Sequence, residues 1–168
     1  MICKVNALEV LDVSNNQLTG QIPQCLLNSS NSIVVLAMRN NLFQGNLPET
    51  FINGCGLITL DLNHNQIQGK IPRSLGKCKM LEVSNLGNNQ FNDTFPFWLE
   101  SLPELQILVL RANGFHDPIW DPLINFGLSK LHVIDLSHNN FSGKLPSKYF
   151  QNWSAIQGVT DKDKSQPR

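Results

Sequence analysis

The sequence predicts an α/β solenoid: a right-handed superhelix with a parallel sheet on its concave face and 3-10 or irregular segments on its convex side. A stretch of the form L-x-x-L-x-L-x-x-N-x-L recurs six times in the 168 residues, with conservative replacements. The asparagines of the six copies lie 25, 24, 24, 24 and 26 residues apart. A period of this length is typical of proteins whose repeats stack and contact only their neighbours.

Each repeat is expected to contribute one short strand. Side chains alternate between the two faces of a strand, so Leu60 and Leu62 point into the core while Asp61 points outwards. Parallel stacking of the strands then predicts two buried columns. The first column holds Leu11, Leu36, Leu60, Leu108 and Ile134, with Ser84 in place of a leucine, and the second holds Val13, Met38, Leu62, Leu86, Leu110 and Leu136.

The asparagine that follows each strand has a structural reason. The chain turns inwards there, and the turn leaves backbone donors and acceptors that the sheet does not satisfy. An amide side chain supplies both donors and an acceptor, so we expect it to bridge successive turns. This ladder consists of Asn16, Asn41, Asn65, Asn89, Asn113 and Asn139.

Four repeats continue with a glycine and an apolar-proline pair. In the third repeat these are Gly69 and Ile71-Pro72. Glycine permits a backbone turn that a side chain would hinder, and proline presets φ for a short helical turn. We therefore expect a short helical turn on the convex side after each pair. Asp93 and Asp117 replace this glycine in the fourth and fifth repeats.

Charge and apolar content exclude several classes of protein. The 13 basic and 13 acidic residues balance, so the chain lacks the excess of positive charge that is typical of nucleic-acid-binding proteins. No apolar run approaches the ~20 residues of a membrane-spanning helix, and the amino terminus lacks an apolar run of signal-peptide length. We assign residues 1–157 to one repeat domain without capping repeats, and residues 158–168 to a polar tail that we expect to be disordered.

The stretches "NDTFPFWL" and "YFQNW", with the x-G-x-I-P form of the repeats, resemble plant leucine-rich-repeat receptor-like proteins of the Cf-type disease-resistance group. The resemblance covers about residues 8–157. It implies the plant-type repeat fold and a place on the extracellular side of the plasma membrane. Members of the family lack a kinase and act with partner receptor kinases. In the family's layout this chain is an ectodomain fragment, or a truncated relative, that ends at the boundary of the island.

The resemblance implies a non-catalytic segment that binds a peptide or protein ligand for a cell-surface immune receptor. The alternative is a secreted inhibitor of a cell-wall enzyme such as polygalacturonase, which uses the same repeat type between disulfide-bonded caps. A truncated relative without activity is a third possibility. The six repeats and the "YFQNW" boundary favour the receptor.

The sequence offers no catalytic, cofactor or metal site. His64 and His138 share one repeat position, just before the ladder asparagine, where we expect an exposed turn residue. His116 and His132 have no paired nucleophile. No phosphate-binding loop or metal-ligand cluster is present, so we expect no enzyme and no cofactor.

The cysteines at positions 3, 25, 55 and 78 have uneven spacing and no C-x-x-C motif, which argues against zinc. Two interpretations of Cys55 and Cys78 stay open. They are small buried thiols that pack the convex side, or they form a disulfide between adjacent repeats, whose ~4.8 Å stacking suits disulfide geometry.

The concave face is the best candidate for binding. Its outward columns vary between repeats while the core columns do not, which suits a recognition surface, although an ordinary solvated sheet face is the competing interpretation. We expect Arg39 and Arg111 to hold a carboxylate, with small Gly87 leaving room between them. The tentative ligand-binding residues are Arg39, Asp61, Asn63, Asn85, Arg111 and Asp135, and the candidate glycosylation sites are Asn28, Asn92, Asn140 and Asn152.

Overall fold

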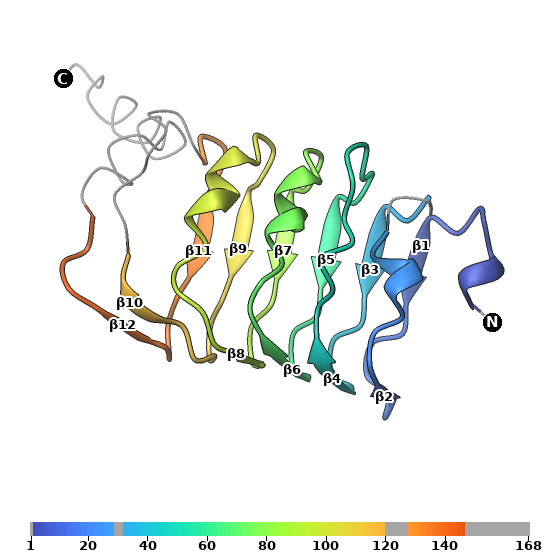
Figure 1. Cartoon of the computed structure of the whole chain (residues 1–168), viewed down its shortest axis with the longest axis horizontal. Helices are drawn as coiled ribbons and strands as arrows, with labels where there is room; N and C mark the ends of the chain where they lie inside the picture. The colour runs from blue at the N-terminus through green and yellow to red at the C-terminus, as the bar shows by residue number, and fades with distance from the viewer. Residues whose placement is uncertain (1, 29–31, 120–127, 147–168) are drawn as a thin grey trace, which may run out of the picture.

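The computed structural model describes residues 2–28, 32–119 and 128–146. Its main feature is a six-stranded parallel sheet in which strands of successive repeats lie side by side in the order β1-β3-β5-β7-β9-β11 (Figure 1). This main sheet confirms the predicted parallel solenoid. Its strands are β1 (Val10–Asp12), β3 (Val35–Ala37), β5 (Thr59–Asp61), β7 (Val83–Asn85), β9 (Ile107–Val109) and β11 (Val133–Asp135).

The register of the main sheet confirms the predicted columns. Ser84 lies between Leu60 and Leu108, and all three side chains are fully buried. Leu11 in the first strand and Ile134 in the last are only partly buried. Among the described residues these two strands are the edges of the sheet, and each has a neighbouring strand on one side.

A second parallel sheet, which the sequence analysis did not predict, runs along the lower edge of the solenoid in Figure 1. The expectation of one strand per repeat was therefore incomplete. Phe43, Ile67 and Phe91 in this sheet are buried in the core. Its strands are β2 (Thr19–Gly20), β4 (Leu42–Asn46), β6 (Gln66–Gly69) and β8 (Gln90–Phe91), and a separate pair, β10 (His116–Pro118) and β12 (Asn140–Ser142), follows in the last two repeats.

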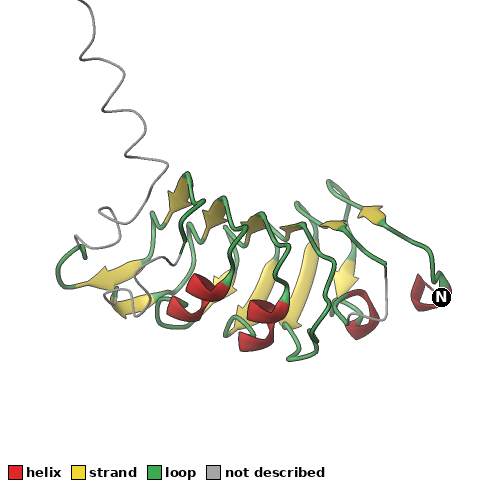
Figure 2. Cartoon of the chain, turned by 90° about the horizontal axis from the view of Figure 1, so that it is seen from above, coloured by secondary structure: helices red, strands yellow, loops and turns green. Residues whose placement is uncertain are grey.

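Short 3-10 helices lie on the side opposite the main sheet (Figure 2), and the described residues contain no α-helix. The expected helical turn is missing after Leu47-Pro48. There the carboxylate of Glu49 instead accepts the backbone N–H groups of Arg73 and Ser74, both at 2.8 Å, at the start of the next repeat's helix. The helices are η1 (Ile2–Lys4), η2 (Gln24–Leu26), η3 (Arg73–Lys77) and η4 (Phe97–Ser101).

Two disulfides join neighbouring repeats. Cys3 pairs with Cys25 and Cys55 with Cys78, with Cα–Cα distances of 5.6 and 4.7 Å. The structure thus supports the disulfide interpretation of Cys55 and Cys78 over that of free thiols. The candidate glycosylation site Asn152 and the tail at 158–168 lie outside the described residues.

Candidate recognition face

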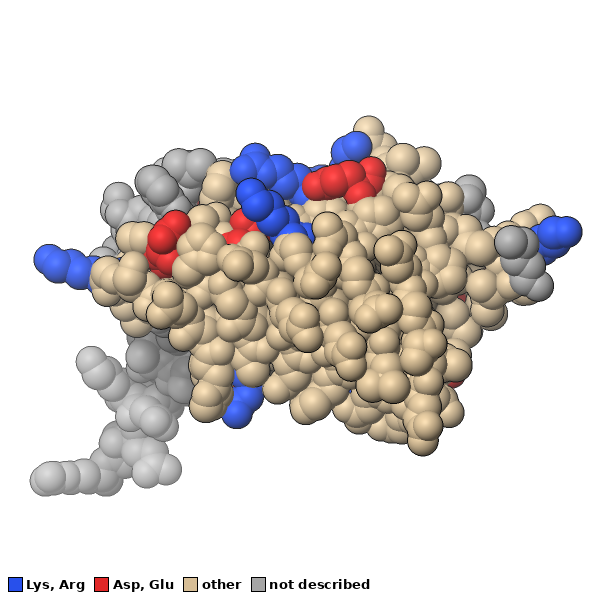
Figure 3. All heavy atoms as spheres, turned by 60° about the horizontal axis from the view of Figure 1, so that its bottom comes forward, with Lys and Arg blue, Asp and Glu red and all other residues tan. Residues whose placement is uncertain are grey.

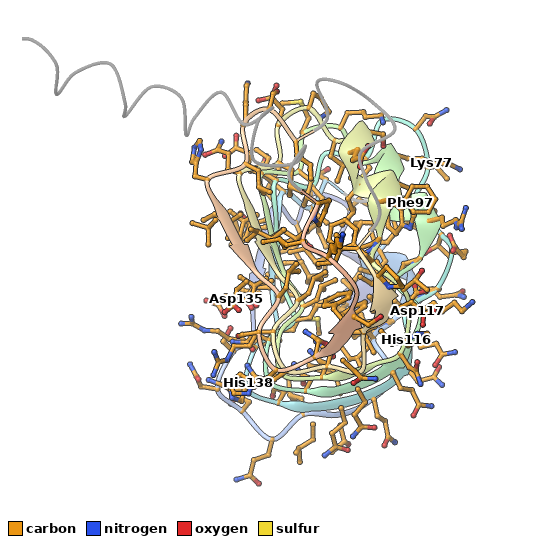
Figure 4. The ribbon with its side chains drawn as sticks, turned by 90° about the vertical axis from the view of Figure 1, so that its left-hand side faces the viewer. Lys77, Phe97, His116, Asp117, Asp135 and His138 are labelled. Atoms are coloured by element: carbon orange, nitrogen blue, oxygen red, sulfur yellow. A yellow bond between two sulfur atoms is a disulfide. The ribbon has the colours of Figure 1, made fainter. Side chains whose placement is uncertain are left out.

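The outward side of the main sheet, together with the residue two positions after each strand, forms one continuous surface that we call the main-sheet face. Figure 4 shows Asp135, on this face, at the opposite side of the solenoid from Phe97 in η4. All six tentative ligand-binding residues lie on the main-sheet face. Arg39 and Arg111 are exposed, and Asp61, Asn63, Asn85 and Asp135 are partly buried.

Three of these residues have a local structural role. The side-chain oxygens of Asp61, Asn85 and Asp135 accept the backbone N–H two residues later, at 3.1, 3.3 and 3.0 Å. Such a hydrogen bond is typical of an Asx turn, which ends the strand. One oxygen of each side chain is therefore already bound within the protein, and this reduces what it can offer to a ligand.

Arg111 belongs to a network that joins the last two repeats. Its Nη1 donates to the hydroxyl of Ser137 at 3.0 Å, and that hydroxyl donates to Oδ1 of Asp135 at 2.6 Å. The hydroxyl of Ser137, followed by its backbone N–H, lowers the pKa of Asp135 below its ordinary value. The charge of Arg111 acts in the same direction. The guanidinium is thus held in position on the sheet.

Arg39 has a less constrained environment. Within the described residues, no hydrogen bond or ion pair holds its guanidinium. Its acidic neighbours are Asp12 and Asp61, and burial raises the pKa of Asp61. The backbone N–H of Asn63 and the charge of Arg39 oppose this effect without cancelling it.

The expectation that Gly87 leaves room between the two arginines is wrong. Gly87 is buried, and a Cβ atom at this position would lie 3.1 Å from the side chain of Val109. It would also lie 3.3 Å from the carbonyl oxygen of Arg111 and from Oδ1 of Asn63. Neighbouring repeats already fill this space, so a ligand has to lie over the position rather than enter it.

The ladder asparagines border the main-sheet face. In the second to sixth repeats, each amide nitrogen donates to a backbone carbonyl of the preceding repeat at 2.9 to 3.0 Å. Each Oδ1 accepts a backbone N–H of the preceding repeat at 3.0 to 3.1 Å. Asn16, in the first repeat, donates to the carbonyl groups of Val13 and Ser14 in its own repeat.

The residue before each ladder asparagine has a left-handed backbone conformation, with φ between 52° and 58°. Asparagine tolerates this conformation better than most residues, and histidine is also enriched there. His64 and His138 are exposed at this turn, as expected. Ala112 is neither an asparagine nor a histidine, so its side chain does not favour this conformation. The six residues are Asn15, Asn40, His64, Asn88, Ala112 and His138.

A pocket that the sequence analysis did not predict lies at a break in the second sheet. Between β8 and β10, the described residues provide an isolated bridge from Thr94 to His116 and a backbone hydrogen bond from Gly114 to the carbonyl of Phe91 at 2.7 Å. Asp93 occupies the repeat position at which four other repeats have a glycine with positive φ. The pocket, which we call the side pocket, encloses about 340 Å³. Its lining includes Lys70, Arg73, Asn92, Phe97 and Trp98.

The face that carries the second sheet is largely uncharged. In Figure 3, most of the visible lysine, arginine and acidic side chains lie along one border of this face, and the others lie at its remaining edges. A groove of about 260 Å³ on the second sheet is lined by amide side chains. These are Gln21, Gln44, Gln66, Gln68 and Gln90.

Comparison with known proteins identifies the repeats. The Leucine Rich Repeat family matches residues 7–29, 56–78 and 130–152. Receptor-like protein 32 of Arabidopsis thaliana is 45% identical over 168 residues, which cover 99% of this chain and 19% of the relative. These repeats belong to the plant receptor-like protein family. The receptor-like segment thus spans about a fifth of the length of this relative.

Solved plant ectodomains share the fold of the receptor-like segment. The crystal structure of PEPR1 with AtPEP1 has a TM-score of 0.83 and 32% identity, over 92% of this chain and 21% of that one. The ectodomain of the Arabidopsis receptor kinase HAESA, in complex with an extended IDA peptide hormone, has a TM-score of 0.81 and 28% identity, over 88% and 24%.

Two features are absent from the described part of the receptor-like segment. Its residues include no group of three or more histidine, cysteine, aspartate or glutamate side chains that could hold a metal ion. None of its helices has the length and apolar character needed to cross a membrane.

Proposed function

We propose that this chain is a non-catalytic recognition segment of a plant cell-surface receptor, and that its main-sheet face binds a peptide or protein ligand. The similarity to the HAESA ectodomain, solved with a peptide hormone, carries this proposal. HAESA has also been solved with the peptide and the co-receptor SERK1. A partner receptor kinase is therefore part of the proposal.

Arg39 and Arg111 are the residues to which we assign carboxylates of the ligand, one to each arginine. They lie in one column three repeats apart, about 14 Å at ~4.8 Å per strand. Arginine binds a carboxylate through two parallel hydrogen bonds. The network of Arg111 with Ser137 fixes its side chain in advance, which lowers the entropy lost on binding. Asn63 and Asn85 lie between the arginines. The Oδ1 atom of each already accepts a hydrogen bond within the protein, so it is their amide nitrogens that can donate to the peptide backbone.

The disulfides support an extracellular location for the segment. Disulfides form and persist in oxidising compartments and are rare in the cytosol. Both pairs join adjacent repeats of the solenoid, so they are part of its fold. Together with the receptor-like relatives, they support the proposal that the segment lies on the outer side of the plasma membrane.

The relatives favour this function over the secreted inhibitor, because those reported above are a receptor-like protein and receptor ectodomains. The test uses a library of synthetic peptides with free C-terminal carboxylates, incubated with the immobilised chain. Retained peptides are identified by mass spectrometry, and the same library with amidated C-termini is the control. We expect the free carboxylates to be retained preferentially.

Arginine variants then locate the site. Arg39→Ala and Arg111→Ala should each weaken binding of a retained peptide about ten-fold or more, the range of a truncated interface arginine. Lys70→Ala and Arg73→Ala, away from the main-sheet face, should leave binding unchanged. If Lys70→Ala and Arg73→Ala weaken binding while Arg39→Ala and Arg111→Ala do not, the ligand does not bind the main-sheet face.

A further inference from the structure

We propose that Asn92 carries an N-linked glycan whose first sugars lie in the side pocket. Asn92, Asp93 and Thr94 form an N-x-T sequon, the acceptor for N-glycosylation. The side chain of Asn92 is exposed and lines the side pocket. The inference rests on the proposed extracellular location, because the sugar is added in the secretory pathway.

The modification is a transfer of an oligosaccharide from a polyprenyl diphosphate carrier to Nδ2 of Asn92. A bond forms between Nδ2 and C1 of the first sugar while the bond between C1 and the diphosphate oxygen breaks. The diphosphate leaves with the bonding electrons, and the amide nitrogen loses one proton. The reaction changes no oxidation state, and the carrier is its only co-substrate.

A glycine in the following repeat leaves space for a sugar on one side of Asn92. In the preceding repeat, Gly69 pairs with Phe91 and its carbonyl accepts the backbone N–H of Asn92 at 2.9 Å, so the register places Lys70 on the other side. In the following repeat, a Cβ atom at Gly114 would lie 3.0 Å from the carbonyl oxygen of Phe91 and 3.8 Å from Cβ of Asn92. The following repeat therefore places no side chain against the attachment point, and the preceding repeat contributes Lys70 to the side pocket.

The aromatic residues at the start of η4 form an apolar wall of the pocket. The guanidinium of Arg73 lies 5.8 Å from the centre of the Phe97 ring. The ring of Trp98 lies close to Gly76 in η3, where an added Cβ atom would be 3.4 Å from Cε3. These contacts position both rings, which are partly exposed. An aromatic ring provides a flat apolar surface for the C–H face of a sugar.

Polar groups complete the pocket. Lys70, Asp93 and His116 also line it, and Figure 4 shows His116 on the same side of the solenoid as Phe97. N-acetylglucosamine presents hydroxyl and acetamido groups beside its apolar face. A pocket with an aromatic wall and side chains that donate and accept hydrogen bonds suits both parts of this sugar.

Asn140 provides a matched control within the chain. It also begins a sequon, with Ser142, and its side chain is exposed. Unlike Asn92, it pairs with His116, so a side chain rather than a glycine lies beside it. It is not among the residues that line the side pocket. A glycan at Asn140 is therefore expected to extend into solvent.

The test compares two variants of the full chain, secreted from plant cells behind an added cleavable signal peptide. Thr94→Ser keeps the sequon, and Thr94→Val removes it with little change in volume. Mass spectrometry of peptides measures the glycan at Asn92, and hydrogen–deuterium exchange is followed over residues 97–101. We expect full-length Thr94→Ser to carry the glycan and to exchange several-fold more slowly in this segment than Thr94→Val.

Two controls separate the glycan from the substitutions. The same pair made without glycans in the bacterial periplasm should exchange alike, and Ser142→Thr against Ser142→Ala should leave residues 97–101 unchanged. The inference is overturned if the secreted chain lacks a glycan at Asn92, or if the secreted pair differs no more than the bacterial pair. Because the signal peptide imposes export and peptide binding is measured separately, these outcomes are distinct from failure of the proposed function.

Discussion

Asn89 accepts a hydrogen bond from the backbone nitrogen of Ile67, in the preceding repeat, at 3.1 Å. The amide nitrogen of the same side chain donates to the carbonyl groups of Leu62 and Leu86 at 2.9 and 3.2 Å. Asn89 thus joins two turns of the solenoid through backbone groups that neither sheet pairs. The same arrangement recurs in the neighbouring repeats, so the ladder connects the solenoid along its length.

Replacing Asn89 by alanine should lower the free energy of unfolding by roughly 2–4 kcal/mol, because each buried backbone group left unpaired costs about 1–3 kcal/mol. Urea denaturation followed by circular dichroism measures the change. Asn16→Ala is the control, since the exposed Asn16 bonds to carbonyl groups of its own repeat. Equal losses for the two variants would contradict a bridging role for the ladder.

Ser84 is the weak position of the buried column. Its side chain is fully buried between two leucines, and its Oγ has no hydrogen-bond partner among the described residues. Ser84→Ala should therefore stabilise the fold by about 1 kcal/mol, since it removes an unpaired hydroxyl. Ser84→Leu should raise the midpoint further by restoring apolar burial. A lowered midpoint for Ser84→Leu beside a raised one for Ser84→Ala would show that neighbouring side chains have filled the space.

Ala112 adopts a left-handed conformation, with φ of 52°, that disfavours a residue with a Cβ atom. Ala112→Gly should raise the free energy of unfolding by about 0.5–1 kcal/mol, after allowance for the greater flexibility of glycine in the unfolded chain. Ala37→Gly, in strand β3, is the matched control and should lower it by about 0.5–1 kcal/mol. Thermal denaturation of both variants and the parent chain measures the changes in stability. A loss of stability in Ala112→Gly would count against backbone strain at this turn.

The main sheet was predictable because its signal repeats. Alternation within one repeat is weak, but the same three-residue pattern at a fixed period places every strand in register. The second sheet lacked such a signal. Its strands are two to five residues long, and the buried Phe43 or Ile67 stands alone between exposed residues. Pairing between repeats creates these strands, so their local sequence shows little preference for them.

The candidate site was predictable only in part. The sequence placed Arg39 and Arg111 in one exposed column, and the structure shows both arginines exposed. It did not show the crowding at Gly87, because that crowding comes from Val109 and Asn63 in the neighbouring repeats. The sequence did show that Asp93 replaces a glycine of the repeat. The break in the second sheet depends on how three consecutive repeats meet, which a pattern within one repeat does not describe.

Asp61 and Asp135 occupy the same column but should affect stability with opposite signs. Burial raises the pKa of Asp61, whereas the hydroxyl and backbone N–H of Ser137 lower that of Asp135. Folding therefore disfavours the charge of Asp61 and favours that of Asp135. An amide can replace either carboxylate in the turn, because Asn85 in the same column accepts the equivalent backbone N–H at 3.3 Å.

Asp61→Asn should therefore stabilise the protein at pH 7, and Asp135→Asn should destabilise it. For Asp61, the unfavourable contribution is present above the raised native pKa and disappears as the pH falls below the unfolded value of about 3.9. For Asp135, the favourable contribution is present above about 3.9 and is lost as the pH falls through the lowered native pKa. The differences in free energy of unfolding between each variant and the parent chain should both shrink as the pH falls from 7 to about 3. Urea denaturation at the two pH values tests this, and a shift of the same sign for both variants at pH 7 would contradict the assignment of burial to one residue and hydrogen bonding to the other.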